Sequence, residues 1–175
     1  MKFLVAVFCF LPFLSPAQDC SLKDVKDPLN QDTRLSTGGK KFGAGNDRFM
    51  LSGEADKNEI DFFFMLDNSS LCFDPYSRLT VIFEGGKLKG NYRSGGAENC
   101  KGYFHVIFKN QANHPAALKN LAEKKVISLK FTAADRKTIK EITLTPEEQN
   151  TLMKMASCIL SESAALLNDT WKPKQ

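Results

Sequence analysis

An export signal at the amino terminus, followed by four cysteines, constrains this chain more than any other feature of its sequence. A positive charge at the second residue precedes an apolar stretch over residues 3–14, and small residues at Ser15 and Ala17 fit a cleavage site. The apolar stretch is shorter than the ~20 residues that cross a bilayer. Residues 1–17 are therefore predicted to be a signal peptide that is cleaved near Ala17–Gln18, which makes the mature chain secreted or periplasmic.

The cysteines that remain after cleavage form an even set: Cys20, Cys72, Cys100 and Cys158. An even number in an oxidising compartment predicts two disulfides. Buried free thiols and a metal site are the alternatives, but no Cys-x-x-Cys or His-x-x-x-His spacing supports a metal. A lipid anchor on Cys20 is disfavoured because the charged Asp19 directly precedes it.

Size and charge limit the class of protein. Residues 18–175 suit one domain that is large enough to bury a core. The chain has a net charge of +4, which falls by one when Lys2 is removed, and both signs are interspersed. Proteins that bind nucleic acid usually concentrate basic residues on one face, so no nucleic-acid partner is expected. The sequence has no second apolar stretch long enough for a transmembrane segment.

Alternating apolar residues predict most of the strands. In chain order these are residues 48–52, 59–66, 78–84, 87–93, 102–109, 126–133 and 138–144. The first two are expected to form a hairpin around a polar turn at residues 53–58, and the next three a meander whose first turn is Gly85–Gly86. Phe63 and Met65 make one strand apolar on both faces, which is typical of a central strand with something packed on each side.

Two segments have the spacing of helices, and the rest of the chain is arranged around them. A short helix begins near Pro115, and Thr145–Glu148 is a capping box that opens a long carboxy-terminal helix. Residues 18–46 are expected to be an extended lead-in with a short edge strand, and residues 169–175 a polar tail. Residues 47–168 are predicted to form a single α+β domain: an antiparallel sheet of six to seven strands, built from the meander and hairpins, with both helices packed on it. A closed barrel with an external helix is the alternative.

The expected strand order also predicts how the cysteines pair. Cys72 precedes one meander strand and Cys100 precedes the strand two along, so both lie at the same end of the sheet. The expected disulfides are therefore Cys72–Cys100 and, from the remaining pair, Cys20–Cys158. A closed loop of this size contributes ~3–4 kcal/mol on the chain-entropy model.

No motif in the sequence specifies a catalytic centre. The two histidines, His105 and His114, have no recognisable nucleophile near them and are expected to be structural. The acidic residues between Asp56 and Asp74 lack the EF-hand pattern and are expected in turns. We therefore assign no catalytic residue, no metal site and no cofactor.

Two features are candidates for ligand binding. A glycine-rich basic hairpin offers backbone amides and cations to an anion, although it lacks phosphate-loop spacing and an exposed hairpin is favoured. The chain also has 14 phenylalanines, some of which could line an apolar pocket between sheet and helix, although a core built from Phe is favoured. The candidate residues are Lys87, Lys89 and Arg93 in the hairpin, and Phe62, Phe64, Phe104 and Phe108 in the pocket.

Several short features occur together over most of the mature chain. They are the Ala17–Gln18 junction, Cys20 soon after it, Asp27–Pro28, Arg34-Leu35-Ser36-Thr37, the helix end Leu121–Lys125 and the capped final helix with Cys158. In this layout the chain resembles small, uncharacterised secreted proteins of Gram-negative bacteria. The resemblance implies a periplasmic or exported domain and transfers no catalytic residues.

These observations favour an exported, non-catalytic binding or interaction domain whose partner is an unknown protein. A carrier of a small apolar molecule in the Phe-lined pocket is the second hypothesis. An enzyme of unknown class is the third, and it requires a histidine in a cleft beside Asp or Ser.

The exposed-hairpin interpretation can be tested by charge reversal. We expect Lys87→Glu combined with Arg93→Glu to leave the fold intact, because surface substitutions usually change stability by less than ~0.5 kcal/mol. Circular dichroism and thermal unfolding measure this. An unfolded double variant would contradict the interpretation.

Overall fold

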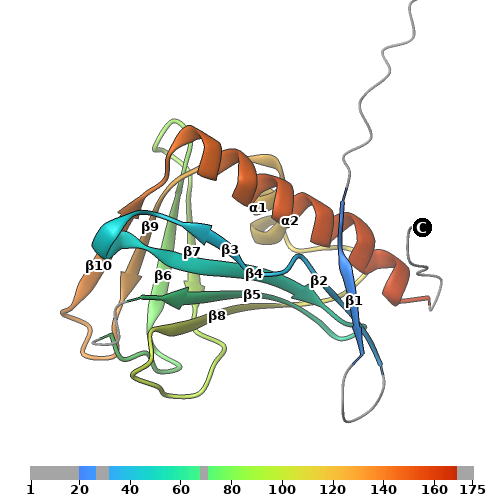
Figure 1. Cartoon of the computed structure of the whole chain (residues 1–175), viewed down its shortest axis with the longest axis horizontal. Coiled ribbons are helices and arrows are strands. Elements are labelled where there is room, and N and C mark those ends of the chain that lie inside the picture. The colour runs from blue at the N-terminus through green and yellow to red at the C-terminus, as the bar shows by residue number, and fades with distance from the viewer. Residues whose placement is uncertain (1–19, 27–31, 68–70, 169–175) are drawn as a thin grey trace, which may run out of the picture.

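The computed structural model describes residues 20–26, 32–67 and 71–168, so the predicted signal peptide and polar tail lie outside the described residues. The described strands form two antiparallel sheets (Figure 1). The first has the order β1 (Lys23–Lys26), β2 (Thr33–Ser36), β4 (Phe49–Ala55), β5 (Glu59–Leu66), β8 (Tyr103–Lys109), with β3 (Lys40–Phe42) also paired to β4. The second has the order β10 (Ile139–Thr143), β9 (Val126–Thr132), β6 (Arg78–Phe83), β7 (Lys89–Arg93).

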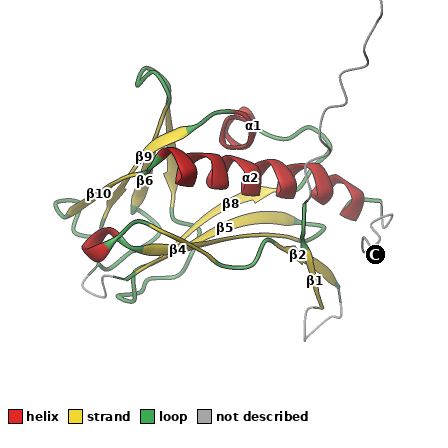
Figure 2. Ribbon diagram, turned by 45° about the horizontal axis from the view of Figure 1, so that its top comes forward, coloured by secondary structure: helices red, strands yellow, loops and turns green. Residues whose placement is uncertain are grey.

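The helices complete an α+β fold, which confirms the predicted class. They are a short 3-10 helix (Gly45–Asp47), α1 (Ala116–Glu123) and the long α2 (Pro146–Leu166). Figure 2 shows α2 lying over the first sheet with α1 beside it. The capping box is present as expected, because Thr145 Oγ1 accepts from the Glu148 amide while the Glu148 carboxylate accepts from the Thr145 amide. The described strands close no barrel, and no described helix is long and apolar enough to cross a membrane.

The strands are divided between two sheets, whereas the sequence predicted one sheet containing a meander. The difference arises at the third strand of the predicted meander, because β8 pairs with β5 rather than with β7. The physical reason is burial of the inner residues of β8. The ring of Phe104 lies 5.1 Å from that of Phe73 and 5.4 Å from that of Phe131, so β8 must reach the centre of the core. Pairing with β5 also places Phe104 directly opposite Phe64. The alternation of apolar residues within a strand does not indicate which distant strand it pairs with, so the sequence did not predict this pairing.

The segment predicted to be an extended lead-in contributes three strands to the first sheet. The predicted edge strand is β2, which lies between β1 and β4, so β1 takes the edge position. Leu35 and Phe42 are 0% and 1% exposed. The core therefore includes residues before the predicted domain start at residue 47.

Gly53 shows why β4 is longer than the sequence predicted. The sequence places a turn from residue 53, but β4 continues to Ala55 with Gly53 on its buried side. A Cβ atom at Gly53 would lie 3.1 Å from Ile159 Cγ1 of α2. The glycine therefore allows α2 to approach the sheet closely, which is a recognised use of glycine inside a strand.

Both disulfides, Cys20–Cys158 and Cys72–Cys100, have the pairing expected from the sequence. The reason for the second differs from the one expected, since β6 and β8 belong to different sheets. Phe73 and Asn99 exchange two backbone hydrogen bonds of 2.7 and 2.9 Å, and this isolated bridge brings the neighbouring cysteines together. The two disulfides are compatible with an oxidising compartment.

The packing role of Gly53 gives a prediction for stability. Gly53→Val should lower the free energy of unfolding by about 1–3 kcal/mol, because the new side chain must displace Ile159 or shift α2. Urea denaturation measures the change. Ser52→Val is the matched control, since the neighbouring residue points to the opposite side of β4. Equal stability of the two variants would contradict the proposed helix contact.

Candidate functional site

Alternate residues of β4, β5 and β8 point away from α2 and form a surface that we call the outer face. Its residues follow from strand register in three cross-strand rows: Met50, Met65 and Tyr103; Ser52, Phe63 and His105; Glu54, Asp61 and Ile107. The opposite side of the same strands is buried against α2 and the second sheet. Polarity therefore changes along the strands, from an apolar end to a charged end.

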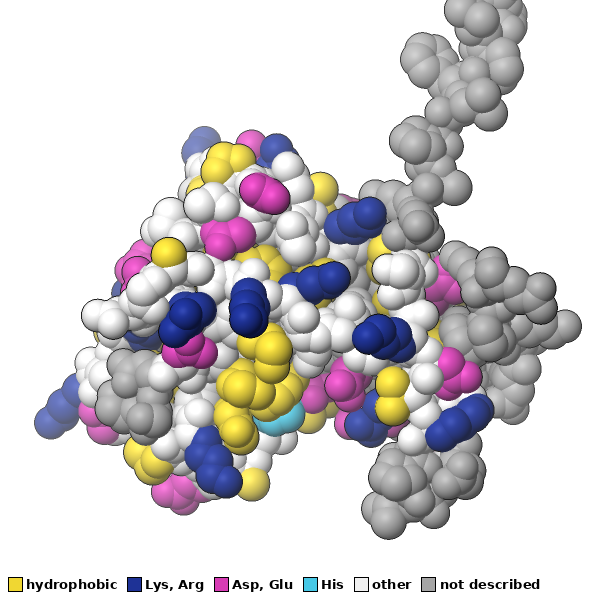
Figure 3. Space-filling view, in the orientation of Figure 1, with side chains coloured by type: hydrophobic (Ala, Val, Ile, Leu, Met, Phe, Trp, Pro, Cys, Tyr) yellow, Lys and Arg dark blue, Asp and Glu magenta, His cyan; other side chains and the backbone are white. Residues whose placement is uncertain are grey.

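Aromatic and aliphatic side chains form a strip along the outer face, from Tyr103 at the apolar end to Ile107 in the row of Glu54 and Asp61. Phe63 stacks on His105 with ring centroids 4.4 Å apart, and it meets Tyr103 edge-on at 5.4 Å. Ile107 is 40% exposed. Figure 3 shows apolar side chains gathered beside a histidine on this side of the molecule. No described element covers the strip as α2 covers the opposite side.

The loop before β8 lies against one margin of the strip. The Gly95 amide donates to the His105 carbonyl at 2.9 Å. A Cβ atom at Gly95 would come within 2.6 Å of Ile107, and one at Gly96 within 2.8 Å of His105. The two glycines therefore let the loop pass close to these side chains, which fixes the position of the strip.

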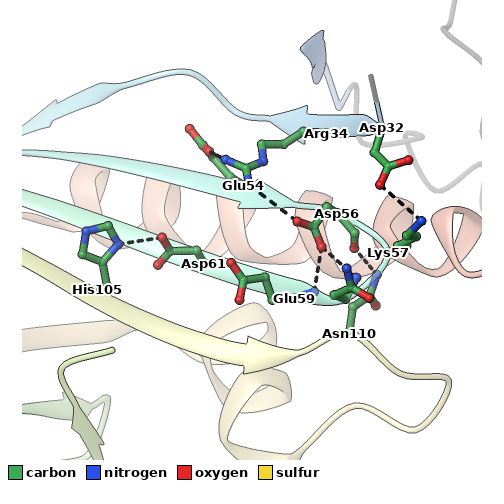
Figure 4. Close-up of polar contacts among 10 residues, drawn as sticks. Asp32, Arg34, Glu54, Asp56, Lys57, Glu59, Asp61, His105 and Asn110 are labelled. Carbon is green, nitrogen blue, oxygen red and sulfur yellow. Dashed lines mark hydrogen bonds and ion pairs between the residues drawn. The ribbon is translucent and has the colours of Figure 1, made fainter. Parts of the chain in front are cut away.

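His105 and Asp61 form a hydrogen-bonded pair at the centre of the outer face (Figure 4). The two atoms that meet are His105 Nδ1 and Asp61 Oδ2, 2.7 Å apart, with Nδ1 as the donor. The hydrogen bond that His105 donates to the Asp61 carboxylate raises the pKa of His105, against the lowering effect of burial. The second oxygen, Asp61 Oδ1, is buried and has no hydrogen-bond partner among the described residues.

Carboxylates gather at the charged end of the outer face, around one guanidinium. Arg34 lies 3.4 Å from Glu54 and 3.5 Å from Asp56. The Asp56 carboxylate also accepts the backbone amides of Asn58 and Glu59, at 2.7 and 2.9 Å. A depression of about 20 Å³ lies among these groups, which is room for a single water molecule. The described residues contain no His, Cys, Asp or Glu cluster suited to a metal ion.

Ser52, the serine in the row of His105, is not placed to act as a nucleophile with the histidine. Ser52 lies in the same row as His105, but Phe63 occupies the strand between them. Two strand spacings separate the hydroxyl from the imidazole by about 10 Å, which is too far for proton transfer. His114 precedes α1 away from this row, and burial lowers its pKa.

The four phenylalanines that were candidates for a pocket lie in the core, which agrees with the favoured interpretation. Phe62, Phe64, Phe104 and Phe108 are between 0% and 8% exposed. The cavity beside Phe62 and Phe64 has a volume of about 10 Å³, whereas a cavity of about 150 Å³ is needed to hold benzene. These four side chains therefore fill the core and do not line an open pocket.

The basic residues predicted as ligand contacts lie on the exposed β6–β7 hairpin. Lys87, Lys89 and Arg93 are all exposed. Gly85 and Gly86 have positive φ angles of 81° and 71°, which the tight turn requires. The hairpin belongs to the second sheet, so these residues are separate from the outer face.

The sequence analysis did not select the outer face as a site, although one signal for it was present. Phe63 and Met65 indicate a strand that is apolar on both faces, and β5 is indeed central, between β4 and β8. Comparison with protein-family models, curated proteins and solved structures found no match to this chain. The resemblance to small secreted proteins stays a prediction, and the geometry must carry the functional argument.

The His105–Asp61 pair predicts a pH dependence of stability. Because folding raises the pKa of His105, the pair stabilises the fold fully below the unfolded-state value of about 6.5 and loses that contribution as pH rises through the folded value. Asp61→Asn should therefore cost more unfolding free energy at about pH 5.5 than at about pH 9.

Urea denaturation at the two pH values measures this difference. His105→Gln should show the same trend, and combining it with Asp61→Asn should add little, because both changes remove one interaction. A cost of Asp61→Asn that is equal at both pH values would contradict the assigned pairing.

Proposed function

We propose that this protein is an exported, non-catalytic binding domain that recognises a protein partner through the outer face. The observation that carries the proposal is that the second half of β5 presents Phe63 and Met65 on the outer face, while α2 and the second sheet pack on the other side of the strand. A central strand of this kind usually has a second layer on its other side. A partner that packs on Phe63, Met65 and Tyr103 would supply that layer.

The charged end of the outer face defines the chemistry of the partner. Four carboxylates, those of Glu54, Asp56, Glu59 and Asp61, lie around the guanidinium of Arg34 and the imidazole of His105, and they outnumber these groups even with Lys109, which is opposite Glu59 on β8. This excess of negative charge favours Lys or Arg on the partner. The partner segment therefore presents an apolar side chain to the strip and a basic side chain to the charged end.

The two other hypotheses have less support from the geometry. A carrier of an apolar molecule requires an open cavity beside Phe62 or Phe64, and the cavity there is of single-water size. An enzyme requires a nucleophile or a second catalytic group within reach of His105, and Phe63 separates it from Ser52. Binding of a partner at the surface requires neither an open cavity nor a nucleophile beside His105.

Export is part of the proposal. The predicted signal peptide supplies the route, and the two disulfides are compatible with an extracellular or periplasmic compartment. The predicted partner is accordingly sought among exported proteins or exposed surfaces.

A photo-crosslinking experiment in the native host tests the proposal. A photoreactive amino acid at Ile107, on the outer face, should give a discrete protein adduct. The matched control is Ile139 on β10, which is also an exposed isoleucine, 51% against 40%, but lies on the second sheet. Mass spectrometry of the adduct identifies the partner.

A second step checks that the adduct depends on the outer face. With the photoreactive group moved to Tyr103, Ile107→Asp should lower the adduct yield at least tenfold, while Ile139→Asp should leave it unchanged. Adducts from both isoleucine positions, or from neither, would contradict the proposal.

A further inference from the structure

A groove lies on the side of the first sheet opposite the outer face. It has a volume of about 230 Å³ and runs between the amino-terminal segment, the start of β3 and the middle of α2. Figure 1 shows the amino-terminal segment passing beside α2. The groove is lined by Cys20, Ser21, Leu22, Thr37, Lys40, Thr151, Lys154, Met155 and Cys158.

Covalent and hydrogen bonds hold the walls of the groove in place. The Cys20–Cys158 disulfide fixes the amino-terminal segment to α2, and Leu22 packs against the core. Thr37 is held by two hydrogen bonds, accepting from the Gly53 amide at 2.9 Å and donating to the Gly38 carbonyl at 3.0 Å. The groove is thus a preformed feature, which lowers the cost of ordering a bound ligand.

The lining combines an apolar floor with a basic rim. Met155 and Cys158 are 5% and 4% exposed and form the floor together with Leu22. Lys40 from β3 and Lys154 from α2 stand at the rim, and neither forms an ion pair with a described residue. Among the described residues, no Asp or Glu contributes to the lining. The groove is therefore complementary to an anion that has an apolar body.

We propose that this groove binds a small amphipathic anion, with its carboxylate or phosphate between Lys40 and Lys154 and its apolar body on Met155 and the disulfide. A cavity of about 150 Å³ holds benzene, so 230 Å³ accommodates a ligand of roughly ten non-hydrogen atoms. The proposal is independent of the proposed function, because the two surfaces are on opposite sides of the sheet.

Calorimetric titration of the mature, disulfide-bonded protein with four probes tests the ligand class. Octanoate and octyl phosphate carry both the charge and the chain, octanol has the chain alone, and inorganic phosphate has the charge alone. We expect saturable binding of octanoate, of octyl phosphate or of both, at least tenfold tighter than that of octanol and phosphate. The tighter of the two charged probes identifies the head group.

Substitutions then place the binding at the groove. Lys40→Met with Lys154→Met should weaken binding of the charged probes at least tenfold, and both residues are exposed, so the fold should persist. The control pair Lys41→Met with Lys137→Met removes the same charge from other surfaces and should leave binding unchanged. Three results would overturn the proposal: no saturable binding up to about 10 mM, equal weakening by both pairs, or octanol binding as tightly as octanoate.

Discussion

Phe131 makes the contact on which the rest of the structure depends. It lies on β9 of the second sheet, and its ring is 5.5, 6.1 and 5.4 Å from those of Phe64, Phe73 and Phe104. Two of these partners belong to the first sheet, so one aromatic side chain joins the inner faces of both. Buried aromatic pairs of this geometry contribute about 0.5–1.5 kcal/mol each beyond area burial. The two sheets also meet where the Tyr92 ring of β7 lies edge-on to Phe108 of β8, at 5.8 Å.

The cluster also determines which side of the first sheet remains open. Once Phe64 and Phe104 face Phe131, period-two alternation directs Phe63 and His105 to the other side. The helix α2 then covers the inner side, where Gly53 gives it room. The outer face is apolar in part because its strands are central, yet no described element takes the place that α2 takes inside. The alternation of side chains along β5 and β8 therefore determines both the packing of the core and the composition of the outer face.

Local patterns predicted the elements of this fold better than their arrangement. The start of α2 is fixed by hydrogen bonds between Thr145 and Glu148, and the tight turn by Gly85–Gly86. Both features depend on neighbouring residues, so the sequence alone predicts them. The pairing of β8 with β5 depends on the contact of Phe104 with Phe131, two residues that are far apart in sequence. The need for glycine at position 53 likewise comes from Ile159, which lies on a later helix. The outer face was overlooked for the same reason, since His105 meets Asp61 only through that non-local pairing.

The opposed positions of the two surfaces allow each to be altered separately. Lys40 and Lys41 are neighbours on β3, yet their register partners are Leu51, which is buried beneath α2, and Met50, which belongs to the outer face. A substitution at either lysine therefore changes the charge of one side of the sheet and leaves the other side in place. The two proposed interactions, with a protein on one side of the sheet and with a small anion on the other, therefore do not compete for the same surface.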